Sequence, residues 1–107
     1  MKSIIQSNKE CYITGCTTGL HEHHIFEGNG RRKLSEQYGL KVWLIPELHN
    51  MSNNGVHYNK ELDLLIKRVG QNAFEERFGT REDFIRIFGR NYIDVDSWRY
   101  KESSRQT

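Results

Sequence analysis

The chain has 107 residues, of which 36% are hydrophobic and 28% are charged, and its formal net charge is only +2. This length and composition suit one soluble domain with a modest core, and so small a charge does not by itself indicate nucleic-acid binding. No apolar run approaches the roughly 20 residues of a membrane-spanning helix, and the N-terminus lacks the apolar stretch of a signal peptide. We therefore expect a single domain over residues 1–107, located in the cytoplasm, with no membrane partner.

The first half of the chain predicts two strands separated by a helix. Residues 20–26 indicate the first strand. Residues 31–38 have a helical composition that ends at Gly39, a residue suited to the left-handed backbone of a helix end. Residues 40–45 indicate the second strand, and Pro46 ends it because proline cannot donate to a strand ladder. We expect the two strands to form a β-hairpin.

The second half predicts two helices after a loop-like stretch over residues 47–56. Apolar residues with a helical period mark the first helix: Leu62, Leu65, Ile66, Val69 and Ala73. Residues 80–83 resemble a capping box at the start of the second helix, and residues 94–107 form a polar tail. This order of elements favours an α+β fold in which a β-hairpin packs against helices, with a core over residues 11–91.

Five histidines form the most informative pattern in the sequence: His21, His23, His24, His49 and His57. Three lie on the first predicted strand, and the other two flank the loop before the long helix. Short connections bring a hairpin and the following helix together, and imidazole is a common ligand of first-row metal ions. Three imidazoles around an ion with one open position form a catalytic rather than a structural arrangement. The pattern therefore predicts a shared metal site.

Two neighbouring positions constrain this site. Adjacent residues of a strand face opposite ways, so His23 and His24 can serve one site only at a strand end or at a bulge. His21 lies on the same face as His23 in an ideal strand. Nothing in the spacing of His21 requires a role, and we expect it to be a bystander.

At His23-His24, over residues 42–50 and at His57, the sequence resembles the HNH nuclease family, whose core is a ββα-metal hairpin and helix. Residues 11–91 as a whole are similar to small phage-encoded HNH proteins. The resemblance implies a β-hairpin plus helix (the ββα-metal core) with an additional C-terminal helix. It also implies a metal-dependent endonuclease that hydrolyses phosphodiester bonds in DNA, working in the host cytoplasm if the protein is phage-encoded.

The same resemblance implies roles for the histidines. His24 is the general base that takes a proton from water, because imidazole is the usual base near neutral pH. Three further histidines are the metal ligands, namely His23, His49 and His57. The cofactor is one divalent metal ion, which is zinc, nickel, manganese or magnesium.

One family feature is missing. The central asparagine that helps to hold the base normally precedes the second strand, where residues 39–41 are here Gly-Leu-Lys. A backbone carbonyl or another side chain then orients His24. Alternatively, His49 takes that role, and His23 and His57 bind the metal together with Glu61.

Basic residues and cysteines indicate further contacts. Arg31, Arg32 and Lys33 form the densest basic cluster, and we expect them to neutralise DNA phosphates; a solvated face is the alternative for such a run.

Cys11 and Cys16 are half of the cysteine set with which many HNH proteins hold a structural zinc, and the expected second pair is absent.

Three functions are open at this point. The first is the HNH endonuclease, which would nick DNA as a monomer or cut both strands as a two-fold homodimer. The second is a non-catalytic zinc-stabilised module that binds nucleic acid or protein. The third is a metal hydrolase for a small molecule, which would need a deep apolar pocket.

Overall fold

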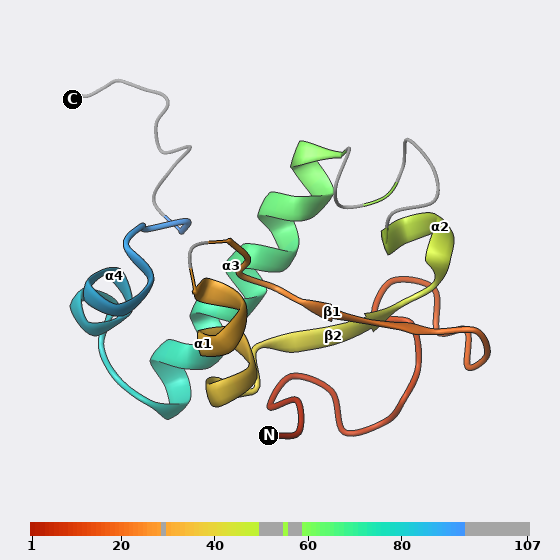
Figure 1. The fold of residues 1–107 in the computed structure, drawn as a ribbon, viewed down its shortest axis with the longest axis horizontal. Helices are drawn as coiled ribbons and strands as arrows, with labels where there is room; N and C mark the ends of the chain where they lie inside the picture. The colour runs from red at the N-terminus through yellow and green to blue at the C-terminus, as the bar shows by residue number, and fades with distance from the viewer. Residues whose placement is uncertain (29, 50–54, 56–58, 94–107) are drawn as a thin grey trace.

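A computed structural model describes residues 1–28, 30–49, 55 and 59–93. In this part of the chain a two-stranded antiparallel sheet and four helices form an α+β fold, which confirms the predicted class (Figure 1). The elements in chain order are β1 (His21–His24), α1 (Arg31–Tyr38), β2 (Lys41–Leu44), α2 (Pro46–His49), α3 (Lys60–Arg77) and α4 (Arg81–Phe88). None of these helices is both long enough and apolar enough to cross a membrane.

The two strands pair residue for residue, without a bulge. His21 lies opposite Leu44, and the register continues through Glu22, His23 and His24. Because side chains alternate along a strand and paired residues share a face, the hairpin has two distinct faces. The inner face carries His21, His23, Val42 and Leu44, and the outer face carries Glu22, His24, Lys41 and Trp43. This alternation decides which histidines can meet.

The chain before β1 covers the outer edge of β2. The Ser3 hydroxyl donates to the Lys41 carbonyl at 2.6 Å, and the Trp43 amide donates to the Gln6 side-chain oxygen at 2.8 Å. Gly39, which ends α1 with φ of 70°, lies so close to Lys2 that an added Cβ would collide with the backbone oxygen of that residue. The N-terminal segment is therefore part of the fold and not a loose extension.

The predicted helices are present, and one more helix was not expected. Helix α1 has the predicted bounds, and α4 begins with a complete capping box between Thr80 and Asp83. Pro46 ends β2 as predicted but also begins the short helix α2, within the stretch that the sequence indicated as a loop. Proline fits the first position of a helix because its missing N–H would have no partner there. Helix α2 contacts both strands and brings His49 to the hairpin.

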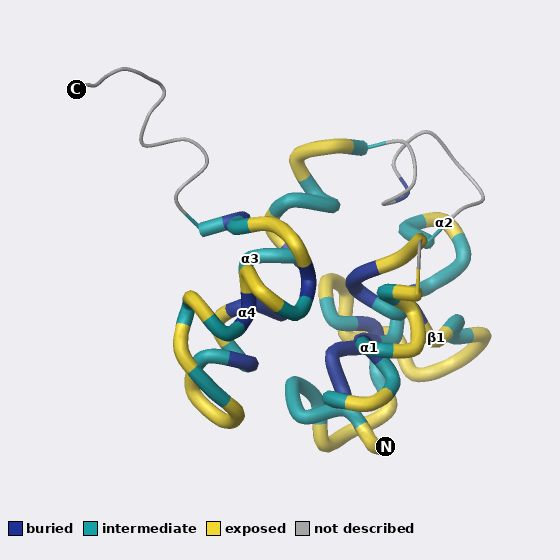
Figure 2. Tube along the Cα trace, turned by 60° about the vertical axis from the view of Figure 1, so that its left-hand side comes forward, coloured by how far each residue is buried: buried dark blue, intermediate teal, exposed yellow. Residues whose placement is uncertain are grey.

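The core lies between the end of β1, α3 and α4. Its largest buried side chains are aromatic: Phe26, Phe74, Phe84 and Phe88. Gly70 of α3 allows the close approach, because a Cβ there would meet Phe26 and Ile25 at 3.0 to 3.2 Å. Figure 2 shows the buried positions on the sides of α3 and α4 that face the rest of the molecule. The hairpin is thus anchored to the helices just beyond His24.

Candidate active site

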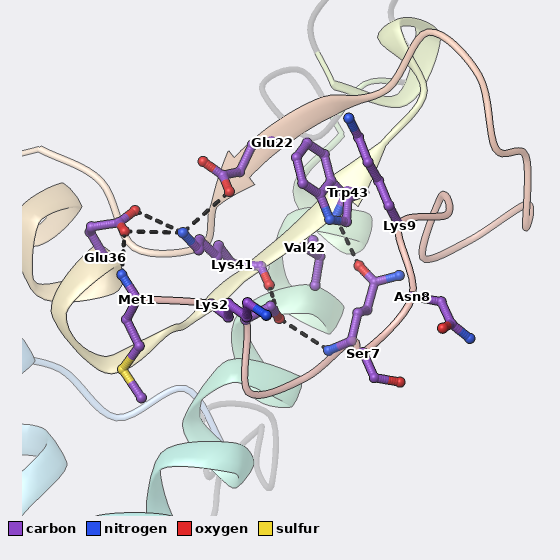
Figure 3. Close-up of a pocket in the computed structure, with 12 residues that line it drawn as sticks. Met1, Lys2, Ser7, Asn8, Lys9, Glu22, Glu36, Lys41, Val42 and Trp43 are labelled. Atoms are coloured by element: carbon purple, nitrogen blue, oxygen red, sulfur yellow. Dashed lines mark hydrogen bonds and ion pairs between the residues drawn. The ribbon is translucent and has the colours of Figure 1, made fainter.

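The outer face of the hairpin holds a histidine–carboxylate pair. His24 is the last residue of β1, and its Nε2 lies 2.8 Å from Oε1 of Glu36, which comes from α1. Lys41, opposite His24 on β2, places its Nζ 3.0 Å from both oxygens of Glu36 (Figure 3). The N-terminal ammonium donates to Oε2 of the same carboxylate at 2.7 Å. Three donors from different segments therefore fix the position of Glu36.

This environment determines which nitrogen of His24 carries the proton. Hydrogen bonds from the N-terminal ammonium, His24 and Lys41 hold the pKa of Glu36 far below its usual range, so the carboxylate stays ionised. An ionised carboxylate can only accept hydrogen bonds, which makes Nε2 of His24 the donor. In the neutral ring Nδ1 is then the atom with a lone pair, and it can accept a proton from a water molecule.

The inner face gathers three other imidazoles. Nδ1 of His21 lies 3.1 Å from Nδ1 of His49, and the ring centroid of His49 is 5.2 Å from those of both His21 and His23. His23 is buried, with 1% of its surface exposed, and its Nδ1 is 4.0 Å from the Glu27 carboxylate. The two strand residues and the end of α2 thus form one histidine cluster, His21, His23 and His49.

The chemistry of the histidine cluster fits a divalent metal ion. Two nitrogens that bind one tetrahedral ion at about 2.0–2.1 Å lie roughly 3.3 Å apart, close to the separation of His21 and His49. The same distance also fits a hydrogen bond between two neutral rings. The donor atoms of the three rings do not all lie within 4.8 Å of one another, so a shared ion would need one ring to rotate.

A second group of possible ligands lies on the outer face. Glu22, His24 and Glu36 each place a ligand atom within 4.8 Å of the others, and together they could hold a metal ion. Nζ of Lys41 lies 3.2 Å from Glu22 and 3.0 Å from Glu36, so an ammonium group already occupies the cation position between the two carboxylates. The outer face therefore suits proton transfer better than metal binding.

These placements separate the residues that the sequence grouped. His23 and His49 are brought together as predicted, whereas His24 lies on the opposite face because β1 pairs regularly through both positions. Nδ1 of His21 contacts Nδ1 of His49 at 3.1 Å, and its expected place as a bystander of the metal site stays a prediction. The period-2 alternation of a strand was the signal that linked His21 to His23. His57 lies outside the described residues.

The partner of His24 was missed. Glu36 is 12 residues away on a helix, and no motif in the sequence marks it. Of the alternatives that the sequence left open, a backbone carbonyl, another side chain or His49, the structure places another side chain, that of Glu36, at Nε2 of His24.

The basic cluster is divided by the fold. Nε of Arg31 donates to the carbonyl of Phe88 at 3.0 Å, at the C-terminal end of α4, where a cation offsets the helix dipole. The guanidinium of Arg31 is therefore anchored at the end of α4, and its assignment to DNA binding stays a prediction. Arg32 and Lys33 are exposed at the start of α1 and are available to phosphates.

Replacing Arg32 and Lys33 together by alanine is expected to weaken DNA binding and to flatten its salt dependence. Each lost phosphate contact should reduce the slope of log affinity against log salt by about 0.9. Fluorescence anisotropy with a labelled duplex at several salt concentrations measures this slope. Arg31→Ala is the matched variant, and it should lower the melting temperature instead. A slope that does not change in the double variant would remove this cluster from the DNA-binding surface.

A groove that Glu36 lines runs along the outer face of the hairpin. It encloses about 540 Å³ between the N-terminal segment and β2, with Glu36 and Lys41 at one end and Trp43 at the other (Figure 3). Nζ of Lys9 lies 4.6 Å from the centre of the Trp43 ring, and Lys2 also lines the groove. The groove is open and is lined by charged, polar and apolar side chains, unlike the deep apolar pocket expected of a small-molecule hydrolase.

The two cysteines form a compact turn. Both thiols are free, and the Cys11 amide donates to the Cys16 carbonyl at 2.7 Å. Burial raises the pKa of the Cys11 thiol, but hydrogen bonds from Thr14 and the backbone of Ile45 outweigh this effect and lower it overall. Among the described residues, no histidine, aspartate or glutamate completes a group of three with these cysteines. Hydrogen bonds within residues 11–16 hold the turn together.

No protein-family model matches the chain, and comparison with curated proteins and with solved structures also gives no match.

Proposed function

We propose that this chain is a metal-dependent endonuclease of the HNH type that hydrolyses phosphodiester bonds in DNA. The observation that carries the proposal is the pair formed by Nε2 of His24 and Oε1 of Glu36, 2.8 Å apart at the end of β1. A base held by a carboxylate can activate a water molecule, which is the first requirement of hydrolysis. The histidine cluster lies on the opposite face of β1, and its rings would supply ligands for a metal ion.

His24 is the general base in this proposal. Glu36 keeps the proton on Nε2 and fixes the ring, so Nδ1 accepts a proton from the attacking water. The imidazolium that forms is stabilised by the carboxylate, and the ammonium of Lys41 keeps that carboxylate ionised. In a direct displacement at phosphorus, the attacking and leaving oxygens lie on opposite sides. His24 and the histidine cluster extend from opposite faces of β1, so this mechanism requires the phosphate to bind at the end of the strand, between the base and the ion.

Two members of the histidine cluster, His23 and His49, would hold one divalent ion together with His57, as expected of a ββα-metal arrangement, and leave one position open for a phosphate oxygen. Zinc, nickel and manganese suit imidazole ligands, and magnesium supports turnover with weaker affinity for nitrogen. When bound, the ion supplies charge neutralisation at the phosphate and at the leaving oxygen. His23 would contribute a buried ligand, and α2 holds His49 against it with 5.2 Å between the ring centroids.

DNA is the substrate that the surface favours. The groove on the outer face carries Lys2 and Lys9 together with the half-buried ring of Trp43, and Arg32 and Lys33 add positive charge on α1. Lysine and arginine neutralise phosphates, and an aromatic ring can stack on a base. These features suit a nucleic-acid strand passing over the outer face.

A plasmid nicking assay tests the proposal. Supercoiled plasmid is incubated with the metal-free protein and then with zinc, nickel, manganese or magnesium, and open-circular and linear products are separated on a gel. We expect cleavage with at least one ion and none with chelator. Tight metal binding without cleavage under any condition would contradict the proposal and favour the non-catalytic zinc module.

Replacing Glu36 by glutamine should lower the cleavage rate constant by about 10- to 100-fold, the usual cost of losing a residue that orients a site ligand or base. The neutral amide holds His24 less firmly and stabilises its protonated form less well. Glu36 and Glu22 both line the groove, so a change of KM should be similar in Glu36→Gln and Glu22→Gln, and the loss of rate constant should be confined to Glu36→Gln. Glu22→Gln is the matched control, since Glu22 shares the outer face and Lys41 but has no bond to His24. Equal rates in both variants would remove Glu36 from its role.

A further inference from the structure

The groove on the outer face of the hairpin has an aromatic end. Trp43 lines the groove and is half-buried, and Figure 3 shows Lys9 beside its ring, with Nζ 4.6 Å from the ring centre. An ammonium group over an aromatic face is a favourable cation–π contact. Because Lys9 itself is exposed, this face of the ring can be reached from the solvent. A flat group that replaces the ammonium can therefore stack on Trp43.

The same end of the groove carries positive charge that no carboxylate offsets. The two acidic residues that line the groove, Glu22 and Glu36, both lie against Lys41. Lys2 and Lys9 are exposed, and no carboxylate of the described residues forms an ion pair with either. The groove thus combines an aromatic face with cations, the two features with which proteins hold a single strand of nucleic acid.

The register of the hairpin places Trp43 close to the proposed base. His24 lies opposite Lys41, and Trp43 is two residues further along β2 on the same outer face. Diagonal neighbours of this kind in an antiparallel pair are roughly 7–8 Å apart. Successive nucleotides of a stacked strand are about 3.4 Å apart, so this distance corresponds to about two nucleotides. A base on Trp43 therefore belongs to a nucleotide near the phosphate that His24 would serve.

Only an unpaired base can use such a ring. In a duplex the neighbouring base pairs cover both faces of each base, and a base reaches a protein ring only after it leaves the stack. The groove encloses about 540 Å³. This volume lies within the range of roughly 300–1,000 Å³ found for small-ligand sites, so the groove suits a nucleotide and not a double helix.

We propose that Trp43 and Lys9 form a subsite for one unpaired nucleotide, so that the enzyme cuts DNA where a strand is single. This inference rests on the proposed function and specifies its substrate. The base stacks on Trp43 in place of the Lys9 ammonium, which then contacts a phosphate of the same strand. Phosphate contacts by Arg32 and Lys33 are open to both forms of DNA, because such contacts position a strand without reading its bases.

Binding in the presence of chelator tests the subsite without cleavage. Fluorescence anisotropy compares a labelled oligonucleotide alone with the same oligonucleotide annealed to its complement. The wild-type protein should bind the single strand more tightly. Trp43→Leu should weaken this binding by about 5- to 150-fold, the loss of one base–aromatic stack, and leave duplex binding nearly unchanged.

Phe78→Leu is the matched control, because Phe78 is an exposed aromatic residue at the end of α3 and does not line the groove. This variant should bind both probes as the wild type does. Equal affinity of the wild-type protein for the two probes would overturn the proposal. A folded Trp43→Leu protein that binds the single strand as tightly as the wild type would also overturn it.

Two measurements do not depend on the folding of the Trp43→Leu protein. In the Trp98→Phe variant Trp43 is the only tryptophan, and single-stranded DNA should quench its emission, whereas duplex should not. Lys9→Ala changes an exposed side chain and should reduce the slope of log affinity against log salt for the single strand by about 0.7. Unchanged emission at saturation, or an unchanged slope, would overturn the subsite.

The binding and cleavage results separate the two proposals. A protein that shows this Trp43-dependent preference for single strands but cleaves no DNA retains the subsite and contradicts the nuclease. A protein that nicks plasmid but binds both probes equally retains the nuclease and contradicts the subsite.

Discussion

Replacing His24 by alanine should lower the rate of plasmid cleavage by about 10²- to 10⁴-fold, the usual contribution of a positioned general base. The fold should be retained, because His24 lies on the outer face at the end of β1 and its partner Glu36 is still held by Lys41. The bound metal should also be retained, since the histidine cluster lies on the opposite face. Initial rates in the nicking assay, compared at saturating metal, measure the effect.

Two outcomes would be informative about this prediction. Full activity of the His24→Ala protein would exclude His24 as the base. Loss of activity together with loss of the metal would place His24 among the ligands instead, and metal analysis of the purified variant distinguishes the two. Glu22→Gln serves again as the control for a change on the same face that does not touch the proposed base.

Replacing His49 by alanine should reduce metal affinity by at least about 100-fold, because roughly 10–16 kcal/mol of binding free energy is shared among four ligands in small zinc sites. His49 is only half-buried at the end of α2, so its loss should leave the core intact. At a metal concentration 100 times the dissociation constant, the wild-type fold gains about 2.7 kcal/mol, and the variant should lose most of this gain. Melting curves with metal and with chelator measure the difference, which should be about 10 °C or more for a domain of this size.

The His21→Ala variant shows whether His21 is a metal ligand or only a hydrogen-bond partner of His49. If His21 belongs to the metal site, its loss should weaken metal binding as His49→Ala does; if the 3.1 Å contact is a hydrogen bond between rings, metal affinity should change little. His57→Ala should behave like His49→Ala by the same proposal. Metal affinity that is unchanged in the His49→Ala protein would show that the histidine cluster is not the metal site.

The sequence by itself determined the local elements. Helix α1 stops at Gly39 because only a residue without a side chain easily adopts the left-handed conformation there, and α4 begins at Thr80 because the capping box with Asp83 satisfies its first amides. Each of these signals acts over a few residues, so it can be recognised without knowing the fold. Proline at position 46 was ambiguous for the same local reason, since it suits both the end of a strand and the first turn of a helix.

The tertiary structure alone decided which side chains meet. Glu36 reaches His24 across 12 residues, His49 reaches His21 across 28, and Arg31 reaches the carbonyl of Phe88 across 57. These contacts depend on how α1, α2 and α4 pack against the hairpin, and the residue types alone do not fix that packing. The sequence indicated that histidines would converge near β1, because short connections limit where they can go. Only the pairing of β1 with β2 assigned His23 to one face and His24 to the other, because a strand sends successive side chains in opposite directions.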